Sequence, residues 1–259
     1  MTKKNRGFRG YFSRRLGIFL RAVFGVIAPT LFFLHSCGIE AYYYLPEVPP
    51  GNITTSINQS ASVSLPGNLP SYFTYFALYY RIYISYDQPV ANTGNLRDVN
   101  PVLDSDYRYL ASYTSATSTT GINVASVMGS RSYQPLFFET GSGISGDILD
   151  TGGTMRIEFP FSAASAPSIS YPGGTARLMR SDGGGAFSPR PDRYFINSSE
   201  LNNPANISAT VNADVVNASG SGSTRYAYAA IYIASTGLNE QSFMPIFSIP
   251  TFVGIFRLP

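Results

Sequence analysis

Apolar and more polar side chains alternate with a period of two along residues 72–86. The even positions carry Phe76, Leu78, Tyr80, Ile82 and Ile84, and the odd positions carry Tyr79, Arg81, Tyr83 and Ser85. Because successive side chains of a strand point to opposite faces, this pattern predicts a β-strand with a buried even face. It also predicts that the odd face is in contact with solvent.

Two more long segments favour strands. Residues 225–234 alternate tyrosine and alanine with small or aliphatic residues, and residues 246–256 are largely apolar. Pro250 and Gly254 in the second segment indicate a sheet edge or a kinked terminal strand. Shorter strands are predicted at residues 61–65, 136–139, 154–159, 175–179 and 207–216.

One segment has helical spacing instead. Asn100 and Pro101 form an N-cap followed by proline at the first helical position, which predicts a helix from Pro101 to Tyr113. Asp106 interrupts the apolar face of this helix. The whole pattern predicts a mainly β protein, a β-sandwich with one short inserted helix.

The first 36 residues follow a different pattern. Six lysines and arginines precede Arg21, and a run of thirteen mostly apolar residues follows it, from Ala22 to Leu34. A membrane-spanning helix needs about 20 apolar residues, whereas the core of a signal peptide needs roughly 7–15. Residues 1–36 are therefore interpreted as an export signal. The next residue, Cys37, is the only cysteine of the chain.

Leu34, Ser36 and Cys37 resemble the lipobox of bacterial lipoproteins of the spirochaete type, although His35 departs from the usual small residue. The resemblance implies that Cys37 becomes the mature N-terminus and carries acyl chains such as palmitate. It implies a lipid anchor in the cell membrane or outer membrane, with the protein periplasmic or exposed on the surface. The alternative is a buried free cysteine at the end of a hydrophobic segment.

Removal of the signal changes the charge of the protein. Seven of the 18 lysines and arginines precede Cys37 and none of the 15 acidic residues does, so the remaining chain has a formal charge of −4. It contains no lysine, histidine or tryptophan, and no cysteine besides Cys37. This composition disfavours a nucleic-acid partner, cysteine–histidine zinc sites and Ser-His-Asp catalysis, and we expect no metal and no cofactor. Asp104 and Asp106 lack the spacing of a calcium loop.

Residues 37–58 contain Pro46, Pro49, Pro50 and Gly51 and are interpreted as a lipid-anchored tether. Residues 59–259 are expected to form the β domain. The strands at 72–85 and 226–234 resemble strands C and F of fibronectin-type-III and immunoglobulin-like sandwiches, without the core tryptophan or the cysteine pair. The resemblance implies an elaborated sandwich with a long insertion at about residues 87–220.

Asp150, Thr151 and Gly152 follow two apolar residues and resemble the active-site turn of aspartic peptidases. That chemistry requires two carboxylates that share a proton, and the chain has no second Asp-Thr-Gly. A symmetric dimer would be needed to supply it. The alternative is a strand that ends in a tight turn, for which the same residues are typical.

Arginines and aromatic residues lie on both sides of the turn at residues 182–185. We predict a ligand-contact loop formed by Arg177, Arg180, Arg190, Arg193 and Tyr194. Guanidinium groups beside aromatic rings suit a carboxylate, a sulfated glycan or an anionic lipid headgroup. The alternative is a solvated loop in which these arginines pair with Asp182 and Asp192.

These patterns together favour a non-catalytic envelope or surface lipoprotein that binds a protein or glycan through loops of a β-sandwich. A structural periplasmic component of the envelope is the alternative, and a hydrolase that uses Asp150 is a further one. The sequence leaves the oligomeric state open.

Overall fold

The computed structural model describes residues 45–56, 59–86, 95–113, 124–141, 143–149, 151–160, 165–181, 189–195, 214–216, 225–240 and 243–258. All of them belong to the second of the two compact units of the chain, residues 43–259. The predicted signal at residues 1–36, Cys37 and Asp150 lie outside the described residues.

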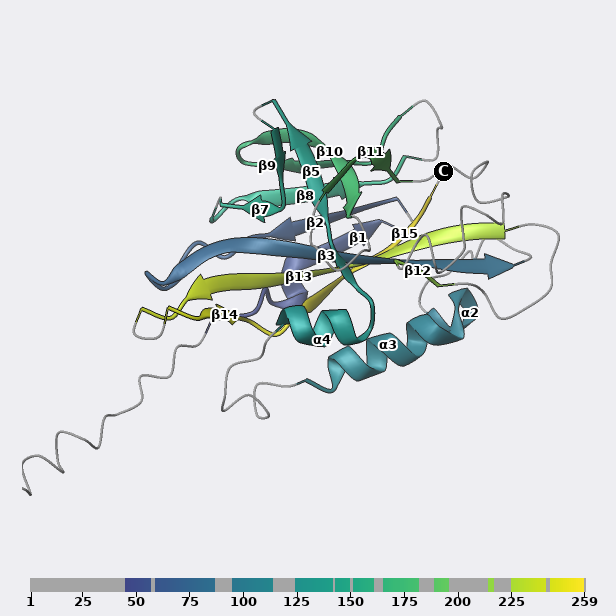
Figure 1. Cartoon of the computed structure of the whole chain (residues 1–259), viewed down its shortest axis with the longest axis horizontal. Coiled ribbons are helices and arrows are strands. Elements are labelled where there is room, and N and C mark those ends of the chain that lie inside the picture. The colour runs from purple at the N-terminus through teal and green to yellow at the C-terminus, as the bar shows by residue number, and fades with distance from the viewer. Residues whose placement is uncertain are drawn as a thin grey trace, which may run out of the picture. The chain divides into compact units, whose positions relative to one another are not determined.

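Two sheets make up the domain, which is mainly β (Figure 1). In the first sheet the strand order is β1 (Ile53–Ser56), β2 (Ser60–Ser64), β8 (Thr154–Glu158), β9 (Ser168–Tyr171), β10 (Gly174–Ser181), β5 (Phe137–Thr140) and β6 (Gly143–Ser145). β11 (Pro189–Tyr194) also pairs with β10. All these pairings are antiparallel.

The second sheet is built on two long strands, β3 (Phe73–Tyr86) and β13 (Arg225–Leu238). They pair antiparallel from Arg225 opposite Tyr86 to Gly237 opposite Phe73. β14 (Pro245–Phe247) and β15 (Thr251–Arg257) pair with the other edge of β13, and three short strands pair with β3: β4 (Gln134–Pro135), β7 (Asp147–Ile148) and β12 (Val215–Val216). β12 is parallel to β3. The order β3–β13–β15 has the neighbour relations of strands C, F and G in an immunoglobulin-like sandwich.

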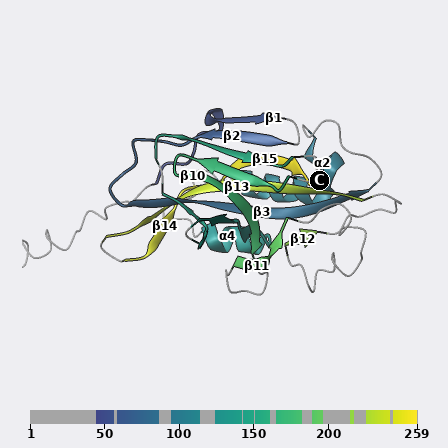
Figure 2. The same cartoon turned by 90° about the horizontal axis from the view of Figure 1, so that it is seen from above.

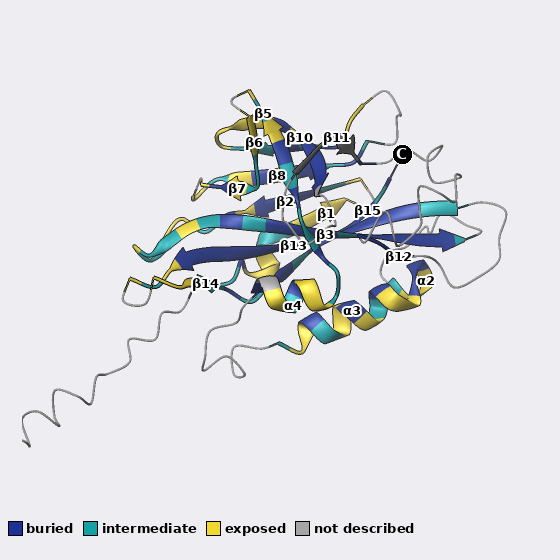
Figure 3. Ribbon diagram, viewed as in Figure 1, coloured by how far each residue is buried: buried dark blue, intermediate teal, exposed yellow. Residues whose placement is uncertain are grey.

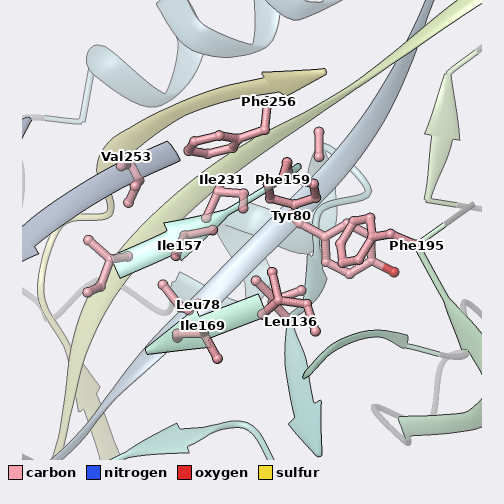
Figure 4. Close-up of a cluster of buried hydrophobic side chains, with 14 of the residues drawn as sticks. Leu78, Tyr80, Leu136, Ile157, Phe159, Ile169, Phe195, Ile231, Val253 and Phe256 are labelled. Atoms are coloured by element: carbon pink, nitrogen blue, oxygen red, sulfur yellow. The ribbon is translucent and has the colours of Figure 1, made fainter. Parts of the chain in front are cut away.

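The main core lies between the two sheets, as the sequence predicts for the even face of β3. Phe76, Leu78 and Tyr80 pack there against side chains of the first sheet such as Ile157 and Phe159 (Figure 4). Aromatic contacts take the place of tryptophan and disulfides. The ring of Phe159 stacks on Phe256 at a centroid distance of 5.1 Å, and it meets Phe195 edge-on at 5.2 Å. Figure 4 also labels four aliphatic residues of this core: Leu136, Ile169, Ile231 and Val253.

The prediction that the odd face of β3 is in contact with solvent is wrong. Tyr79 and Tyr83 are buried beneath a layer of helices on the outer face of the second sheet (Figure 3). The layer consists of α2 (Leu96–Val99), α3 (Pro101–Ala111) and α4 (Val124–Ser130). One helix was expected, and the described residues contain three. Leu103 and Leu110 of α3 and Met128 of α4 cover the tyrosines. These side chains form the apolar stripe that each short helix presents to the sheet.

The start of α3 agrees with the prediction. The Asn100 side chain accepts a hydrogen bond from the Val102 N–H at 2.8 Å, with Pro101 at the first helical position. The Asn100 amide also donates to the carbonyl oxygen of Ile84 at 2.8 Å. The same residue thus begins the helix and ties it to the end of β3.

The predicted tether at 37–58 is wrong for residues 45–56. Leu45 and Val48 are buried, and β1 pairs with β2 along its whole length (Figure 2). Pro50 begins a 3₁₀ turn at Pro50–Asn52, with Pro49 at its N-cap position. Composition suggested a linker, but buried apolar side chains and hydrogen bonds from Ser235 and Thr251 hold the segment on the domain.

The predicted insertion at 87–220 supplies all three helices and most strands of the first sheet. It is therefore one layer of the sandwich and not an appendage to a complete one. The predicted strand at 246–256 is divided into β14 and β15 around Pro250. Gly254, at φ +157°, lies at a register shift between Ile231 and Tyr232, which accounts for the expected kink.

Candidate ligand-binding site

The structure separates the arginines of the predicted ligand-contact loop. Arg177 and Arg180 lie in β10, where Arg177 is exposed and Arg180 is only 1% exposed. Arg190, Arg193 and Tyr194 belong to β11, which pairs with β10, and their side chains lie outside the described set. The predicted site therefore spans two paired strands, and Arg180 is not available at its surface.

Arg180 instead forms a buried ion pair. Its Nε and Nη2 atoms donate to Asp214 at 2.7 and 2.6 Å, and the Tyr80 hydroxyl donates to the same carboxylate at 2.8 Å. Burial by itself lowers the pKa of Arg180, but the hydrogen bond and charge of Asp214 raise it above its ordinary value. The arrangement joins β10, β3 and the segment before β12, so its role is structural.

Asp106, the polar residue on the predicted apolar face of α3, is a second buried carboxylate with hydrogen-bond partners. Asp106 accepts hydrogen bonds from Arg81 Nη1 at 2.6 Å and from the Tyr83 hydroxyl at 2.7 Å, and Arg131 Nη1 lies 3.5 Å away. The Tyr83 hydroxyl is also 2.9 Å from that of Tyr133. Asp106 is thus the point at which β3, α3 and the residue after α4 are joined by charge.

A pocket of about 560 Å³ opens between the C-terminal half of α3, the start of β15 and residues 47–50. This volume is typical of small-molecule sites. Its lining combines aromatic rings with a few polar atoms: Glu47, Pro50, Tyr107, Leu110, Ala111, Tyr113, Tyr232, Ile249, Pro250, Thr251 and Phe252. Because separate parts of the chain meet here, the pocket exists only in the folded domain.

The aromatic rings of the pocket form a continuous series. The ring centroids of Tyr107 and Phe252 are 5.2 Å apart, and those of Phe252 and Tyr232 are 5.0 Å apart. Tyr232 continues the series inward to Tyr133 at 5.2 Å. The outermost ring, Tyr107, is 36% exposed, so it offers its surface to a ligand.

Five of the lining residues carry polar or charged side chains: Glu47, Tyr107, Tyr113, Tyr232 and Thr251. The Tyr232 hydroxyl is buried and has no hydrogen-bond partner among the described residues. Burial raises the pKa of Tyr232, so the hydroxyl remains a neutral donor at ordinary pH. The Thr251 hydroxyl is occupied by the carbonyl oxygen of Val48 at 2.7 Å. Among the described residues of the lining, Glu47 is the single charged one, and none is an arginine.

Thr151, Gly152 and Gly153 lie in the segment between β7 and β8. Gly152 has φ +73°, and its N–H donates to the carbonyl oxygen of Pro66 at 3.2 Å. A Cβ atom on Gly153 would lie 2.2 Å from the Pro172 ring, which explains why glycine is required there. Asp150 itself lies outside the described residues, so the peptidase alternative stays a hypothesis.

Comparison of the chain with protein-family models, with curated proteins and with solved structures finds no match. Within the described part of the chain, no group of three or more potential ligand side chains could hold a metal ion. The helices of that part are also too short or too polar to cross a membrane.

The sequence contains no local signal for the aromatic pocket. The spacing of residues 101–113 predicts a helix that contains Tyr107, and that of residues 225–234 predicts a strand that contains Tyr232. Phe252 fell in the segment expected to be a kinked terminal strand. Only the packing of α3 on the second sheet brings the three rings together.

Proposed function

We propose that this protein is a non-catalytic cell-envelope lipoprotein, anchored in the cell membrane or outer membrane through acylated Cys37, that binds a glycan. The anchor is supported by the basic head, the short apolar run and the single cysteine after it. The binding site that we propose is the aromatic pocket between α3 and β15.

The observation that carries the proposal is the chemistry of the pocket lining. Sugar rings have apolar C–H faces that stack on aromatic rings and hydroxyl groups that donate and accept at their edges. Tyr107 and Phe252 supply adjacent rings, while Glu47 supplies a hydrogen-bond acceptor. The pocket thus offers both kinds of contact that a sugar ring uses.

The charge of the lining narrows the class of glycan. The described lining residues include one carboxylate and no basic side chain, so the pocket disfavours sulfated or carboxylated sugars, because an anion would be desolvated beside Glu47. A neutral glycan is therefore the expected ligand. A protein partner would need roughly 800 Å² of surface from each side, which a concave pocket of this size does not provide by itself.

The test is a screen of neutral and acidic glycans against the purified full chain, followed by calorimetry on the glycans that bind. Tyr107→Ala and Phe252→Ala are expected to weaken binding by about tenfold or more, since each removes a stacking surface. Val102→Ala is the matched control. It lies on the same helix, is 38% exposed against 36% for Tyr107, and is not part of the pocket lining.

Binding that survives both aromatic substitutions would refute the pocket as the site. A complete absence of glycan binding, with envelope proteins purified alongside the chain, would favour the structural alternative. Asp150→Ala is expected to leave glycan binding unchanged, because a binding protein does not need that carboxylate.

The anchor has a separate test. Labelled palmitate is expected to enter the wild-type protein and not Cys37→Ser, which should also keep residues 1–36 and have a correspondingly larger mass. Proteinase K treatment of intact and permeabilised cells then distinguishes a surface location from a periplasmic one. Incorporation of label into Cys37→Ser would contradict the assignment of the lipid to this cysteine.

A further inference from the structure

Exposed apolar side chains gather at the turn between β13 and β14. Seven large hydrophobic side chains are exposed among the described residues, and three of them, Leu238, Phe243 and Met244, lie at this turn. Phe243 is 75% exposed and Met244 is 63% exposed. We refer to residues 238–240 and 243–245 as the apolar hairpin.

The backbone of the hairpin holds Phe243 in an unusual conformation. Phe243 has φ +54°, a region that residues with a side chain rarely adopt. Two hydrogen bonds maintain the turn: the Asn239 N–H donates to the Met244 carbonyl oxygen at 2.9 Å, and the Phe243 N–H donates to the Asn239 carbonyl oxygen at 2.8 Å. These two bonds connect Asn239 with Phe243 and Met244 and leave both of the latter side chains exposed.

The hairpin lies at the end of the domain where the N-terminal segment joins it. A Cβ atom on Gly237 would lie 3.0 Å from Leu45 Cδ1, and the Ser235 hydroxyl donates to the Pro46 carbonyl oxygen at 2.8 Å. Asn239 is two residues beyond Gly237, or about 7 Å along the strand. Leu45, the first described residue, and the exposed turn therefore share one end of β13.

Chain length restricts the distance between this end and the lipid. Leu45 is eight positions after Cys37, and an extended chain covers at most about 3.3–3.6 Å per residue, or about 26–29 Å in all. An acylated Cys37 would thus hold the hairpin end of the domain close to the bilayer. The far end of β3, near Asn100 and α3, would face away from it.

From these observations we infer that the apolar hairpin is a second membrane contact, with Phe243 and Met244 inserted at the headgroup level of the bilayer that holds Cys37. The inference rests on the proposed lipid anchor. Exposed Glu240 at the same turn limits the depth of insertion and gives no attraction to anionic lipid. The partner surface is therefore an ordinary zwitterionic bilayer.

The chain contains no tryptophan, so one substitution creates a unique fluorescent reporter. Full-length Phe243→Trp would be extracted from producing cells, reconstituted in phosphatidylcholine vesicles and excited at a wavelength that spares tyrosine. Val102→Trp, on α3 beside Asn100, is the matched exposed control at the far end of β3. Vesicles with brominated acyl chains supply the quencher.

We expect a blue-shifted emission for Phe243→Trp and roughly twofold or stronger quenching than for Val102→Trp. Flotation of the protein with vesicles without selective quenching would overturn the inference and leave the anchor intact. A blue shift without quenching, together with a dimeric mass, would assign the hairpin to a second copy of the chain. A purified protein whose mass shows no acyl chain on Cys37 would overturn both proposals.

Discussion

The buried pair of Arg180 and Asp214 gives the sharpest test of how this domain is held together. Asp214→Ala removes the carboxylate that accepts two hydrogen bonds from the guanidinium and one from Tyr80. The two side chains are 2% and 3% exposed, so water cannot replace the lost partner. Loss of one member of such a pair costs about 3–5 kcal/mol, because the other charge stays buried.

A surface ion pair of the same length serves as the control. Arg156 Nε and Glu158 Oε1 are 2.6 Å apart, as are Arg180 Nη2 and Asp214 Oδ1, but their side chains are 55% and 43% exposed. Glu158→Ala is expected to cost no more than about 1 kcal/mol. The shortest N–O distances of the two pairs are equal, so the difference between the variants reports the burial of Asp214 together with its two additional hydrogen bonds.

The assay is urea unfolding followed by circular dichroism, with thermal unfolding as a second measure. For a domain of this size, 3–5 kcal/mol corresponds to a decrease in Tm of about 6–20 °C. The double variant Arg180→Met with Asp214→Leu is expected to recover most of the loss, since it removes both charges and keeps the volume. It also gives a result if Asp214→Ala does not fold.

The reasoning would be refuted if Asp214→Ala and Glu158→Ala destabilised the protein equally. It would also be refuted if the double variant were no more stable than Asp214→Ala. In either case the desolvated charge would not be the reason for the cost.

Three further predictions concern the same domain. Gly237→Ala should destabilise it by about 1–3 kcal/mol in urea unfolding, because the new Cβ would lie 2.5 Å from a backbone oxygen; Gly129→Ala, with open space around it in α4, should be neutral or slightly stabilising. Desolvation raises the pKa of Asp147, so its ionised form opposes folding. Because the residue is exposed, Asp147→Asn should increase stability at pH 7 only slightly, and the gain should vanish as the pH falls below the ordinary aspartate value, as urea midpoints across pH 3–7 would reveal. Burial also raises the pKa of four tyrosines above the value of 10 that they have when unfolded: Tyr79, Tyr83, Tyr133 and Tyr232. These tyrosines should therefore not affect stability below about pH 10, and stability should be lost above it. Absorbance at 295 nm should record their ionisation only when the protein unfolds. Gradual ionisation of all four in the folded protein would contradict this last prediction.

Much of the secondary structure follows from local pattern. The period of two in residues 72–86 and 225–234 predicts the paired strands β3 and β13, and Asn100 with Pro101 predicts the start of α3. These features are local because a strand or a helix terminus depends on side chains only a few residues apart. The export signal is a pattern of the same local kind, and it stays a prediction.

Only the tertiary structure decides what each face meets. The odd face of β3 reads as solvent-exposed because tyrosine and arginine suit water, yet the helices cover it and Asp106 neutralises Arg81 there. The pattern around Arg180 predicts a surface ligand site, but in the structure Arg180 is buried and paired with Asp214 from a distant segment. The aromatic pocket likewise depends on separate segments that local periodicity treats independently. Contacts between distant segments are fixed by how the layers pack, and single-segment patterns carry no information about the partner.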